Sequence, residues 1–339
     1  MSRKRKPQPT PELSARNDVS RGNDTIRRGD DAAHVAVVIV TFNSADVLSG
    51  CLRSLTGQSA VHLCSVVVAD NASRDESAAI AEAATDLPIR TVQLGRNAGY
   101  AAAINAAIAT LDMRKLDAVF VMNPDCRLRA DALHELAKAL RQPGRAIAVP
   151  RLLNPDDSLQ PSLRRNPTVG RALAEAVIGG DRAGRIGTLG ELVMDPRKYD
   201  HPGPAAWATG AAMLLSADAI RELGPWDESF LLYSEETEYC LRAAERGWKL
   251  WYEPAAVVEH IGGESDTNPT LYALMVTNKV RLFRRRRSAP AGLGYYLAVV
   301  LGETIRAVSG RRTSRAAVVA LLKPSRRRTL ITSITGRPA

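Results

Sequence analysis

Cysteine is scarce in this chain of 339 residues: there are four, at positions 51, 64, 126 and 240, and none forms a C-x-x-C pair. This spacing indicates neither a zinc site nor a disulfide framework, and it suits the reducing cytosol. An apolar stretch like that of a signal peptide is also missing from the first thirty residues, which are polar and rich in Arg, Pro, Ser and Asp. We therefore expect a disordered basic arm over residues 1–33.

Positive charge is short in the middle of the chain. The net charge is +10, but residues 1–30 carry +4 and residues 281–339 carry +13, which leaves −7 on residues 31–280. The basic character belongs to the two ends, so the centre lacks the basic surface of a nucleic-acid-binding core. We expect no nucleic-acid partner.

The glycine-rich turn of dinucleotide-binding proteins is absent as well. The first apolar run, 35–42, leads into Thr41-Phe42-Asn43-Ser44 where such proteins have G-x-G-x-x-G. This absence counts against a dinucleotide-dependent oxidoreductase.

What is present is a regular alternation of strand-like and helix-like segments in a chain that is 45% apolar and 24% charged, a globular balance. Apolar runs predict strands at 35–42, 63–69, 89–94 and 117–122, and helices are predicted at 46–55, 75–84 and 100–111. Strands that alternate with helices of about ten residues indicate a parallel sheet covered on both faces. We predict an α/β fold with a Rossmann-like first half.

The alternation breaks after Pro150. Residues 154–200 form a long stretch containing Pro, Asn, Gly and Arg, which we expect to be a mobile loop or lid. Order returns with a strand at 207–215 and a helix from Ala217. A further helix begins near Ser234, and its first turn is acidic, as the helix macrodipole favours.

The apolar run 117–122 ends abruptly at Asn123-Pro124-Asp125. A strand of this kind delivers the Asp125 carboxylate at the carboxyl edge of a sheet, where α/β proteins bind ligands. Hard divalent cations such as Mg²⁺ are held by one or two carboxylates together with substrate phosphates, so we expect a cation there. Asn-Pro-Asp is also a common turn, and that interpretation stays open for the motif alone.

Two further segments follow expected strands. Asp70 lies at the same sheet edge as Asp125, where a carboxylate can accept the imide N–H of a uracil or thymine ring; alternatively, Asp70 or Ser73 caps the next helix. Residues 96–105 add a glycine and small side chains at a helix start, a surface that a ribose and a diphosphate can approach. Packing of that helix on the sheet would also explain its alanines.

In this order and spacing the segments resemble the family-two glycosyltransferases with the glycosyltransferase-A fold. The resemblance covers residues 35–265. It is carried by residues 40–43 (VTFN), 69–73 (ADNAS), 96–100 (RNAGY), 123–125 (NPD), 209–213 (TGAAM) and 233–242 (YSEETEYCLR). Asn-Pro-Asp together with a Pro-Ser-x-Arg-Arg segment at 161–165 is similar to bacterial rhamnosyltransferases, including actinobacterial ones that build the lipid-linked unit joining peptidoglycan to arabinogalactan.

The resemblance implies roles for particular residues. Donor binding falls to Thr41, Phe42, Asn43, Asp70, Asn71, Arg96, Asn97, Gly99, Asn105, Asn123 and Asp125. Acceptor binding falls to Trp207, Thr209, Gly210, Trp226, Asp227 and Glu235, although the tryptophans can equally fill the core. A divalent metal, Mg²⁺ or Mn²⁺, is assigned to Asp125 and His260; a lone histidine is more often structural, so this assignment comes from the resemblance.

The catalytic base of the family lies in a Glu-Asp pair, which corresponds here to Glu235-Glu236, with Glu238 as a third acidic residue. Glu236 is therefore expected to be the general base. This is a departure from the family pattern, because Glu236 is one methylene longer than the usual Asp.

The implied reaction is inverting, metal-dependent transfer of rhamnose from dTDP-rhamnose to a lipid-linked or polysaccharide acceptor of the cell envelope. Three alternatives stay open: another donor, such as UDP-galactofuranose or UDP-GlcNAc; a nucleotide-sugar-binding protein that has lost turnover; and a peripheral membrane scaffold. The sequence does not fix the oligomeric state.

The expected organisation is a catalytic domain over 34–265, with a donor half at 34–125 and an acceptor half at 126–265. A helical membrane-associating region follows at 266–322, and a basic tail at 323–339. The apolar run 291–302 is shorter than the roughly 20 residues that span a bilayer, but with the neighbouring arginines it suits an interfacial helix on an anionic leaflet. We expect a cytoplasmic protein that is peripheral on the inner membrane face; a helix packed on the catalytic body is the alternative.

Overall fold

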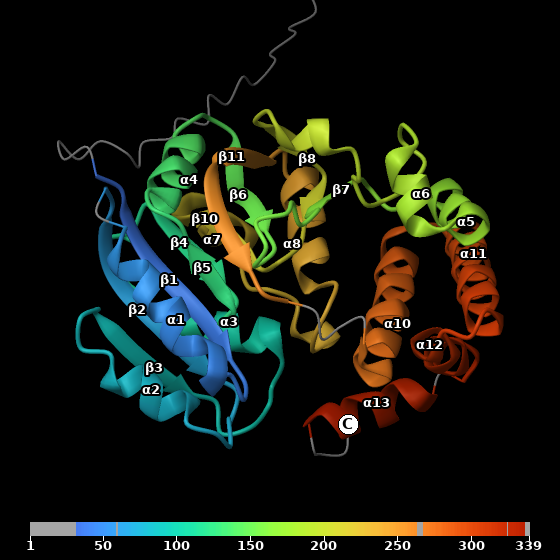
Figure 1. The fold of residues 1–339 in the computed structure, drawn as a ribbon, viewed down its shortest axis with the longest axis horizontal. Helices are drawn as coiled ribbons and strands as arrows, with labels where there is room; N and C mark the ends of the chain where they lie inside the picture. The colour runs from blue at the N-terminus through green and yellow to red at the C-terminus, as the bar shows by residue number, and fades with distance from the viewer. Residues whose placement is uncertain (1–31, 59, 263–266, 324, 336–339) are drawn as a thin grey trace, which may run out of the picture.

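The structure is a computed structural model that describes residues 32–58, 60–262, 267–323 and 325–335. The arm expected over residues 1–33 lies almost wholly outside the described residues. A central sheet with helices on both faces stands beside a group of helices built largely from the carboxyl-terminal part of the chain (Figure 1).

Within the described ranges the main sheet has nine strands in the order β3-β2-β1-β4-β10-β6-β11-β5, and β8 pairs with β11. The strands are β1 His34–Thr41, β2 His62–Asp70, β3 Ile89–Gln93, β4 Ala118–Met122, β5 Cys126–Leu128, β6 Arg145–Leu153, β8 Gly203–Ala205, β10 Ala212–Ser216 and β11 Lys249–His260. Strands β1 to β4 are parallel, and β10 runs antiparallel to both β4 and β6. The predicted α/β architecture with a mostly parallel sheet is confirmed.

Six helices cover the two faces of this sheet. On one face lie α1 Ala45–Thr56, α2 Ser77–Ala83 and α4 Ala132–Leu140, and on the other lie α3 Tyr100–Ile108, α7 Ala217–Leu223 and α8 Glu235–Glu245. Successive side chains of a strand point to opposite faces, so Val37 of β1 packs on the first layer and Val38 on the second, both fully buried. Burial on both faces explains why these strands read as continuous apolar runs.

The strand predicted at 207–215 is two strands. Residues Trp207–Ala208 form β9, which pairs with β7 Leu163–Arg164 in a separate two-stranded sheet, whereas β10 joins the main sheet. Residues 209–211, between β9 and β10, pair with neither sheet because the chain crosses from one sheet to the other there.

The stretch 154–200, expected as a mobile loop or lid, is an insertion with regular secondary structure and not a structureless loop; its mobility stays a prediction. It contains β7, the helices α5 Val169–Ile178 and α6 Gly180–Arg185, and the 3-10 turn η1 Pro196–Tyr199. Helix α5 packs on α11 Ala289–Val308, so closely that a Cβ at Gly302 would lie 3.0 Å from the Cα of Ala176. The ammonium of Lys279 lies 3.0 Å from Glu191 and 3.6 Å from Glu175, which ties the insertion to the carboxyl-terminal helices.

Those helices are α10 Pro269–Arg286, α11, α12 Arg312–Leu322 and α13 Ser325–Thr335. Helices α10, α11 and α12 share a third apolar core with α5, in which the rings of Phe283 and Tyr295 stack 3.9 Å apart. None of the helices in the described part of the chain is both long enough and apolar enough to cross a membrane.

Candidate active site

The candidate site lies where β1, β2 and β4 end. Asp70 closes β2 and is the register partner of Thr41 at the end of β1. The Asp70 carboxylate is 2% exposed and accepts hydrogen bonds from the backbone N–H and the hydroxyl of Ser73. Asp70 therefore shapes the turn after β2. The capping alternative is not met, because α2 begins after Glu76 and has no side-chain cap hydrogen bond.

The turn after β1 is held to the same edge. Asn43 adopts a left-handed backbone with φ of 52°, and its N–H donates to the hydroxyl of Ser73 at 2.9 Å. Phe42 exposes 43% of its surface beside this turn, and the buried hydroxyl of Thr41 has no protein partner within the described residues. An exposed ring next to a strand end provides a flat apolar surface at the predicted donor site.

Residues 96–100 are joined to the same edge by Asn71. Its side-chain amide donates to the carbonyl of Gly99 at 3.3 Å, and its oxygen accepts from the N–H of Ala98 at 3.1 Å. Gly99 has φ of 95°, and a Cβ there would lie 2.3 Å from the carbonyl oxygen of Leu231, so only glycine fits. The side chain of Asn97 accepts from the Gly99 N–H, and Arg96 is exposed next to it.

Asn105, expected in the donor site, binds elsewhere. Its amide donates to the carbonyl of Trp226 at 3.0 Å and to Glu228 at 2.9 Å, and its oxygen accepts from the Trp226 N–H. All its polar groups are thus used to join α3 to the turn at 226–228.

The two expected acceptor residues in that turn have structural contacts. Trp226 is 3% exposed and stacks on Tyr239 of α8 at 4.6 Å, so its ring belongs to the core and offers no open surface to a sugar. Asp227 caps the 3-10 turn η2 Glu228–Phe230 and forms an ion pair of 2.9 Å with Arg285.

Asp125 and His260 come together at the ends of β4 and β11. Asp125 Oδ2 accepts from the Gly262 N–H at 2.9 Å, whereas Oδ1 is buried without a hydrogen-bond partner in the described structure and lies 3.5 Å from His260 Nε2. His260 Nδ1 lies 2.7 Å from Gln160 Oε1, which fixes the proton on Nδ1 and leaves the Nε2 lone pair directed at Asp125. Burial lowers the pKa of His260, against the effect of Asp125, and so favours the neutral ligand form.

These features fit a divalent cation held by an oxygen and an imidazole nitrogen. Cys126 lies in the same cluster, but its thiol is buried and donates to the carbonyl of Ala211 at 3.3 Å. Burial raises the pKa of this thiol well above its usual range, so the thiolate form that binds metals is disfavoured. The amide of Asn123 lies 3.4 Å from His260 Nε2 and completes the cluster.

The three acidic residues at the start of α8 have different surroundings. Glu238 forms a two-point ion pair with Arg242 and also faces Arg286 at 3.6 Å. Glu235 is 2% exposed, and burial followed by repulsion from Glu236 raises its pKa well above the usual range. Glu236 is half-buried; burial raises its pKa, while backbone hydrogen bonds and the charge of Arg164 act in the opposite direction.

Gly210 and Tyr100 link Glu236 to the cluster at Asp125. A Cβ at Gly210 would lie 3.2 Å from the Cβ of Glu236, and the Tyr100 hydroxyl donates to the Gly210 carbonyl at 3.2 Å. Burial raises the pKa of Tyr100 well above its usual range, and the nearby charges of Glu235, Glu236 and Asp125 add to the rise. Tyr100 and Glu236 therefore both lie next to Gly210.

Strand β9, which pairs with β7, leads directly into the turn that carries Gly210. The indole N–H of half-buried Trp207 donates to the carbonyl of Arg165, and the guanidinium of Arg164 lies 5.5 Å from the Trp207 ring. The Thr209 N–H donates to the carbonyl of Ser162 at 3.0 Å. Of the expected acceptor residues, Gly210 lies beside Glu236 and Glu235 directly precedes it on α8. Trp207 and Thr209 lie on the segment that leads to Gly210, whereas Trp226 and Asp227 have the other partners described above.

Sequence reasoning gave no role to Tyr100, Arg164 or Gln160. Tyr100 ends the motif 96–100 and Arg164 belongs to the Pro-Ser-x-Arg-Arg segment, so both lay within recognised motifs. Gln160 precedes that segment directly and meets His260 only through the fold, because a separation of 100 residues leaves no sequence signal.

Comparison with known proteins identifies the family. The family model for glycosyl transferase family 2 matches residues 36–189. The N-acetylglucosaminyl-diphospho-decaprenol L-rhamnosyltransferase of Mycobacterium tuberculosis is 30% identical over 235 residues, which cover 66% of this chain and 75% of that protein. The chain belongs to glycosyltransferase family 2. It is a glycosyltransferase with a rhamnosyltransferase-like sequence, as the resemblance predicted.

Solved structures confirm the fold of the transferase. A mannosyltransferase from Pyrobaculum calidifontis, in complex with GDP-Man and Mn²⁺, aligns with a TM-score of 0.53 at 17% identity and covers 89% of this chain and 86% of its own. The structure of GalNAc-T7 with UDP, GalNAc and Mn²⁺ aligns with a TM-score of 0.55, also at 17% identity, over 74% of this chain and 48% of its own. The transferase therefore has the glycosyltransferase-A fold. At 17% identity, the structural likeness establishes the fold and not the substrates.

A first prediction concerns the charge that faces Glu236. Replacing Arg164 by Gln removes a positive charge that favours the Glu236 carboxylate, so the pKa of Glu236 should rise further, whereas Arg164→Lys should keep it close to the unaltered value. Carboxyl-detected NMR titration of the two variants measures this. If Glu236 titrates identically in the Arg164→Gln variant and in the unaltered protein, the Arg164 charge does not act on Glu236.

Proposed function

We propose that this family 2 transferase moves rhamnose from dTDP-rhamnose to a lipid-linked acceptor of the cell envelope, with inversion at the anomeric carbon. The observation that carries the proposal is the convergence of Asp125, His260, Tyr100 and Glu236 at one edge of the sheet. The named M. tuberculosis relative acts on a diphospho-decaprenol-linked sugar, which supports this donor and acceptor class.

The donor occupies the edge formed by the ends of β1 and β2. Asp70 accepts the imide N–H of the pyrimidine, with Asn43 and Phe42 alongside, and Asn71 holds the 97–99 turn against the ribose and the diphosphate. A divalent cation, Mg²⁺ or Mn²⁺, would be held by Asp125 and His260. When bound, it supplies the positive charge that offsets the negative charge of the leaving diphosphate.

The chemical step is a single displacement. The oxygen of an acceptor hydroxyl forms a bond to the anomeric carbon, the bond from that carbon to the diphosphate oxygen breaks, and the nucleoside diphosphate leaves with the electron pair. Glu236 takes the hydroxyl proton as general base. Its half-buried carboxylate has no ion-pair partner within the described residues, so it is available for this proton, in contrast to Glu238.

The acceptor sugar lies on the side of Glu236 formed by Trp207, Thr209 and Gly210. Glycine at 210 leaves room beside the Glu236 side chain that any Cβ would reduce. Burial and repulsion from Glu236 raise the pKa of Glu235, which disfavours a second negative charge next to the base.

Glu236→Gln tests the base. The amide keeps the shape but cannot accept the proton, so transfer from dTDP-rhamnose should fall by roughly 10²-fold or more with donor affinity nearly unchanged. Glu222→Gln, at an exposed position on α7, is the matched control and should stay close to full activity. If instead Glu235→Gln is the inactive variant, Glu236 is not the base. Separately, an unaltered protein that transfers sugar from UDP-galactofuranose or UDP-GlcNAc but not from dTDP-rhamnose would contradict the proposed donor.

Asp125→Asn tests the metal. The amide oxygen still accepts from the Gly262 N–H, so the turn survives, but the anionic ligand is lost. Apparent Mn²⁺ affinity, measured by calorimetry with dTDP present, should fall roughly tenfold or more. Exposed Asp112→Asn serves as control. Equal dTDP affinity with and without Mn²⁺ or Mg²⁺ in the unaltered protein would refute metal-assisted donor binding.

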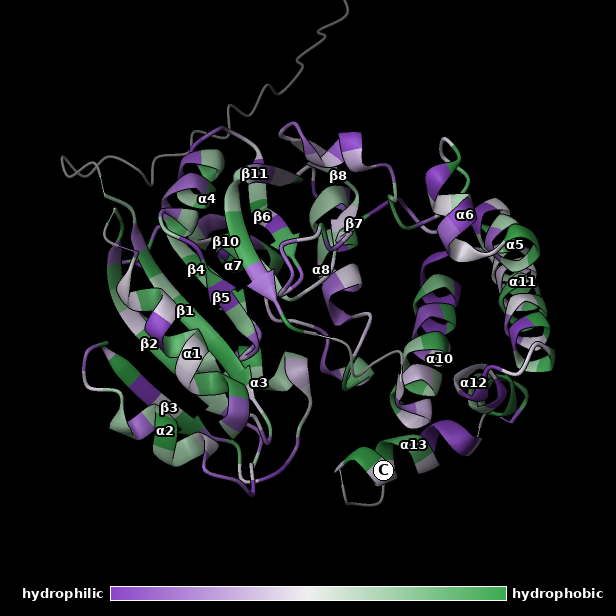
Figure 2. Cartoon of the chain, viewed as in Figure 1, coloured by the Kyte–Doolittle hydropathy of each residue, from purple (hydrophilic) through white to green (hydrophobic). Residues whose placement is uncertain are grey.

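We further propose that the transferase docks on the inner face of the cytoplasmic membrane through an apolar ridge on α11. The ridge consists of Leu293, Leu297, Leu301, Ile305 and Val308, whose exposed fractions range from 43% to 83%. Its spacing of four residues, with a final step of three, puts these side chains on one face of the helix at the outer edge of the helical group (Figure 2). Exposed Arg312 and Arg315 on α12 add positive charge suited to an anionic leaflet.

Leu293→Gln combined with Leu297→Gln tests the ridge. Both side chains are 56% exposed, so the fold should be unaffected, while loss of two apolar groups from the lipid interface should weaken binding to anionic vesicles roughly tenfold or more. Vesicle sedimentation measures binding, and unchanged thermal unfolding controls for folding. Undiminished sedimentation of the double variant would place the contact elsewhere.

A further inference from the structure

The segment 229–234 connects the cap residue Asp227 to the catalytic helix α8, and its backbone is strained. Leu231, Tyr233 and Ser234 have φ of 67°, 68° and 78°, in the left-handed region that side chains other than glycine disfavour. Ser234 directly precedes Glu235 and Glu236. A backbone of this kind persists only where its surroundings hold it, so the contacts around the segment decide where Glu236 lies.

One side of the segment contacts the donor half. The carbonyl of Leu231 accepts from the Tyr100 N–H at 2.8 Å, and Gly99 lies against the same carbonyl. The position of Leu231 therefore affects the start of α3, from which Tyr100 reaches Gly210 beside Glu236.

The opposite side is held by side chains of the carboxyl-terminal helices, first by the amide of Asn278 on α10. The Asn278 side chain is fully buried, and its NH₂ donates to the carbonyls of Phe230 at 2.8 Å, Leu232 at 2.9 Å and Tyr233 at 3.3 Å. Its oxygen accepts from two nitrogens of Arg327 on α13, at 3.1 and 3.2 Å. Every polar group of Asn278 is used between the carboxyl-terminal helices and this segment.

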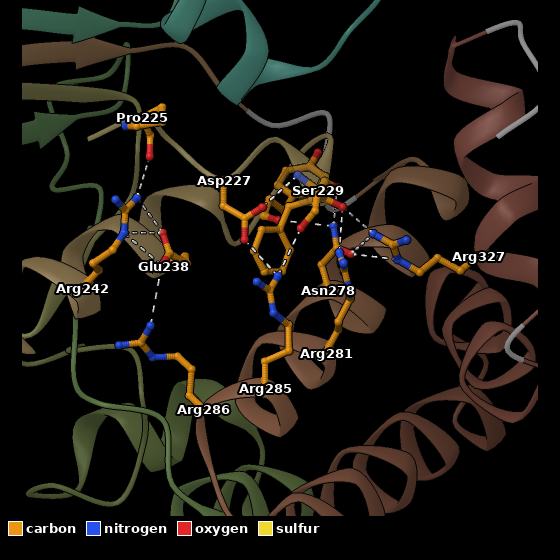
Figure 3. Close-up of polar contacts among 12 residues, drawn as sticks. Pro225, Asp227, Ser229, Glu238, Arg242, Asn278, Arg281, Arg285, Arg286 and Arg327 are labelled. Atoms are coloured by element: carbon orange, nitrogen blue, oxygen red, sulfur yellow. Dashed lines mark hydrogen bonds and ion pairs between the residues drawn. The ribbon is translucent and has the colours of Figure 1, made fainter. Parts of the chain in front are cut away.

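Arginines complete the contact at Ser229. Its carbonyl accepts from Arg327 at 3.0 Å and from Arg281 at 2.7 Å, and its hydroxyl accepts from Arg285 at 3.1 Å (Figure 3). Burial and repulsion from Arg281 lower the pKa of Arg327, which shows that the charged form of Arg327 is disfavoured here. The hydrogen bonds to Ser229 and Asn278 offset this cost.

We propose that Asn278, oriented by Arg327, is a positioning residue for catalysis: it fixes the strained 230–234 segment so that Glu236 and Tyr100 are held in their reactive arrangement. Residues of the last helices then contribute to the chemical step from outside the sheet domain. The inference rests on the proposed role of Glu236, but it does not depend on which sugar is transferred.

Three variants test the proposal. Asn278→Asp has the same shape, but its carboxylate cannot donate to the three carbonyls. Arg327→Gln removes the bonds to Asn278 and Ser229 from a half-buried position and leaves Asn278 itself intact. Arg328→Gln, the next residue on α13 and exposed, makes the same change in net charge and is the matched control.

We expect Asn278→Asp to lower kcat about tenfold or more, because small displacements of catalytic groups have large effects on rate, with the KM for donor within about twofold of the unaltered protein. Arg327→Gln should lower kcat by a smaller factor than Asn278→Asp does, and its KM for donor should also stay within about twofold of the unaltered protein. Hydrogen exchange of amides 230–238 should quicken in both variants, and the Arg328→Gln protein should match the unaltered one.

The outcomes separate the hypotheses. If the Asn278→Asp protein is not soluble, the exchange and kcat of Arg327→Gln, which retains the buried amide, decide the question. Unchanged exchange and kcat in Arg327→Gln, equal losses in Arg328→Gln, or faster exchange without loss of kcat would each overturn the positioning role. Exchange needs no donor, and kcat can be measured with any sugar nucleotide that supports transfer, so failure of dTDP-rhamnose as donor would be seen independently.

Discussion

The pairing of β10 with β4 is the constraint on which the site depends. The antiparallel register that sets Ala212 opposite Met122 puts the turn 209–211 beside the strand end that carries Asp125, and the Asn123 N–H donates to the Ala211 carbonyl at 2.8 Å. Because β10 also pairs with β6, one strand joins the donor half to the second half of the sheet. A slip of one residue would turn every β10 side chain to the other face and displace Gly210 from Glu236.

Around that register the fold arranges three acidic groups with different electrostatic surroundings. Asp125 faces a neutral imidazole whose tautomer is fixed by Gln160, which suits a cation. Glu236 is half-buried with Arg164 near it, and Glu238 is neutralised by arginines. Separate surroundings let neighbouring carboxylates act differently at one pH.

The carboxyl-terminal helices have two surfaces. Arginines of α10 and α13 turn inward to Ser229, Asp227 and Glu238, so part of the basic charge is bound within the protein and not presented to solvent. The outer surface of α11 is apolar. The proposed membrane contact and the proposed positioning contact thus use different surfaces of one helical group, which also includes α5 and α6 of the 154–200 insertion.

The sequence by itself determined the order of the βαβ units and the delivery of Asp70 and Asp125 to one edge, because buried parallel strands read as apolar runs and their carboxyl ends meet. The family resemblance added Glu236 and His260, and the family and fold are confirmed. Only the tertiary structure decided that Trp226 is buried, that Asn105 is used by the 226–228 turn, and that residues 154–200 form helices packed on α11. Contacts such as Gln160 with His260, or Asn278 with the 230–234 segment, join residues about 45 to 100 positions apart. Local periodicity carries no information about such pairs, since their geometry exists only once the sheet and the last helices have packed.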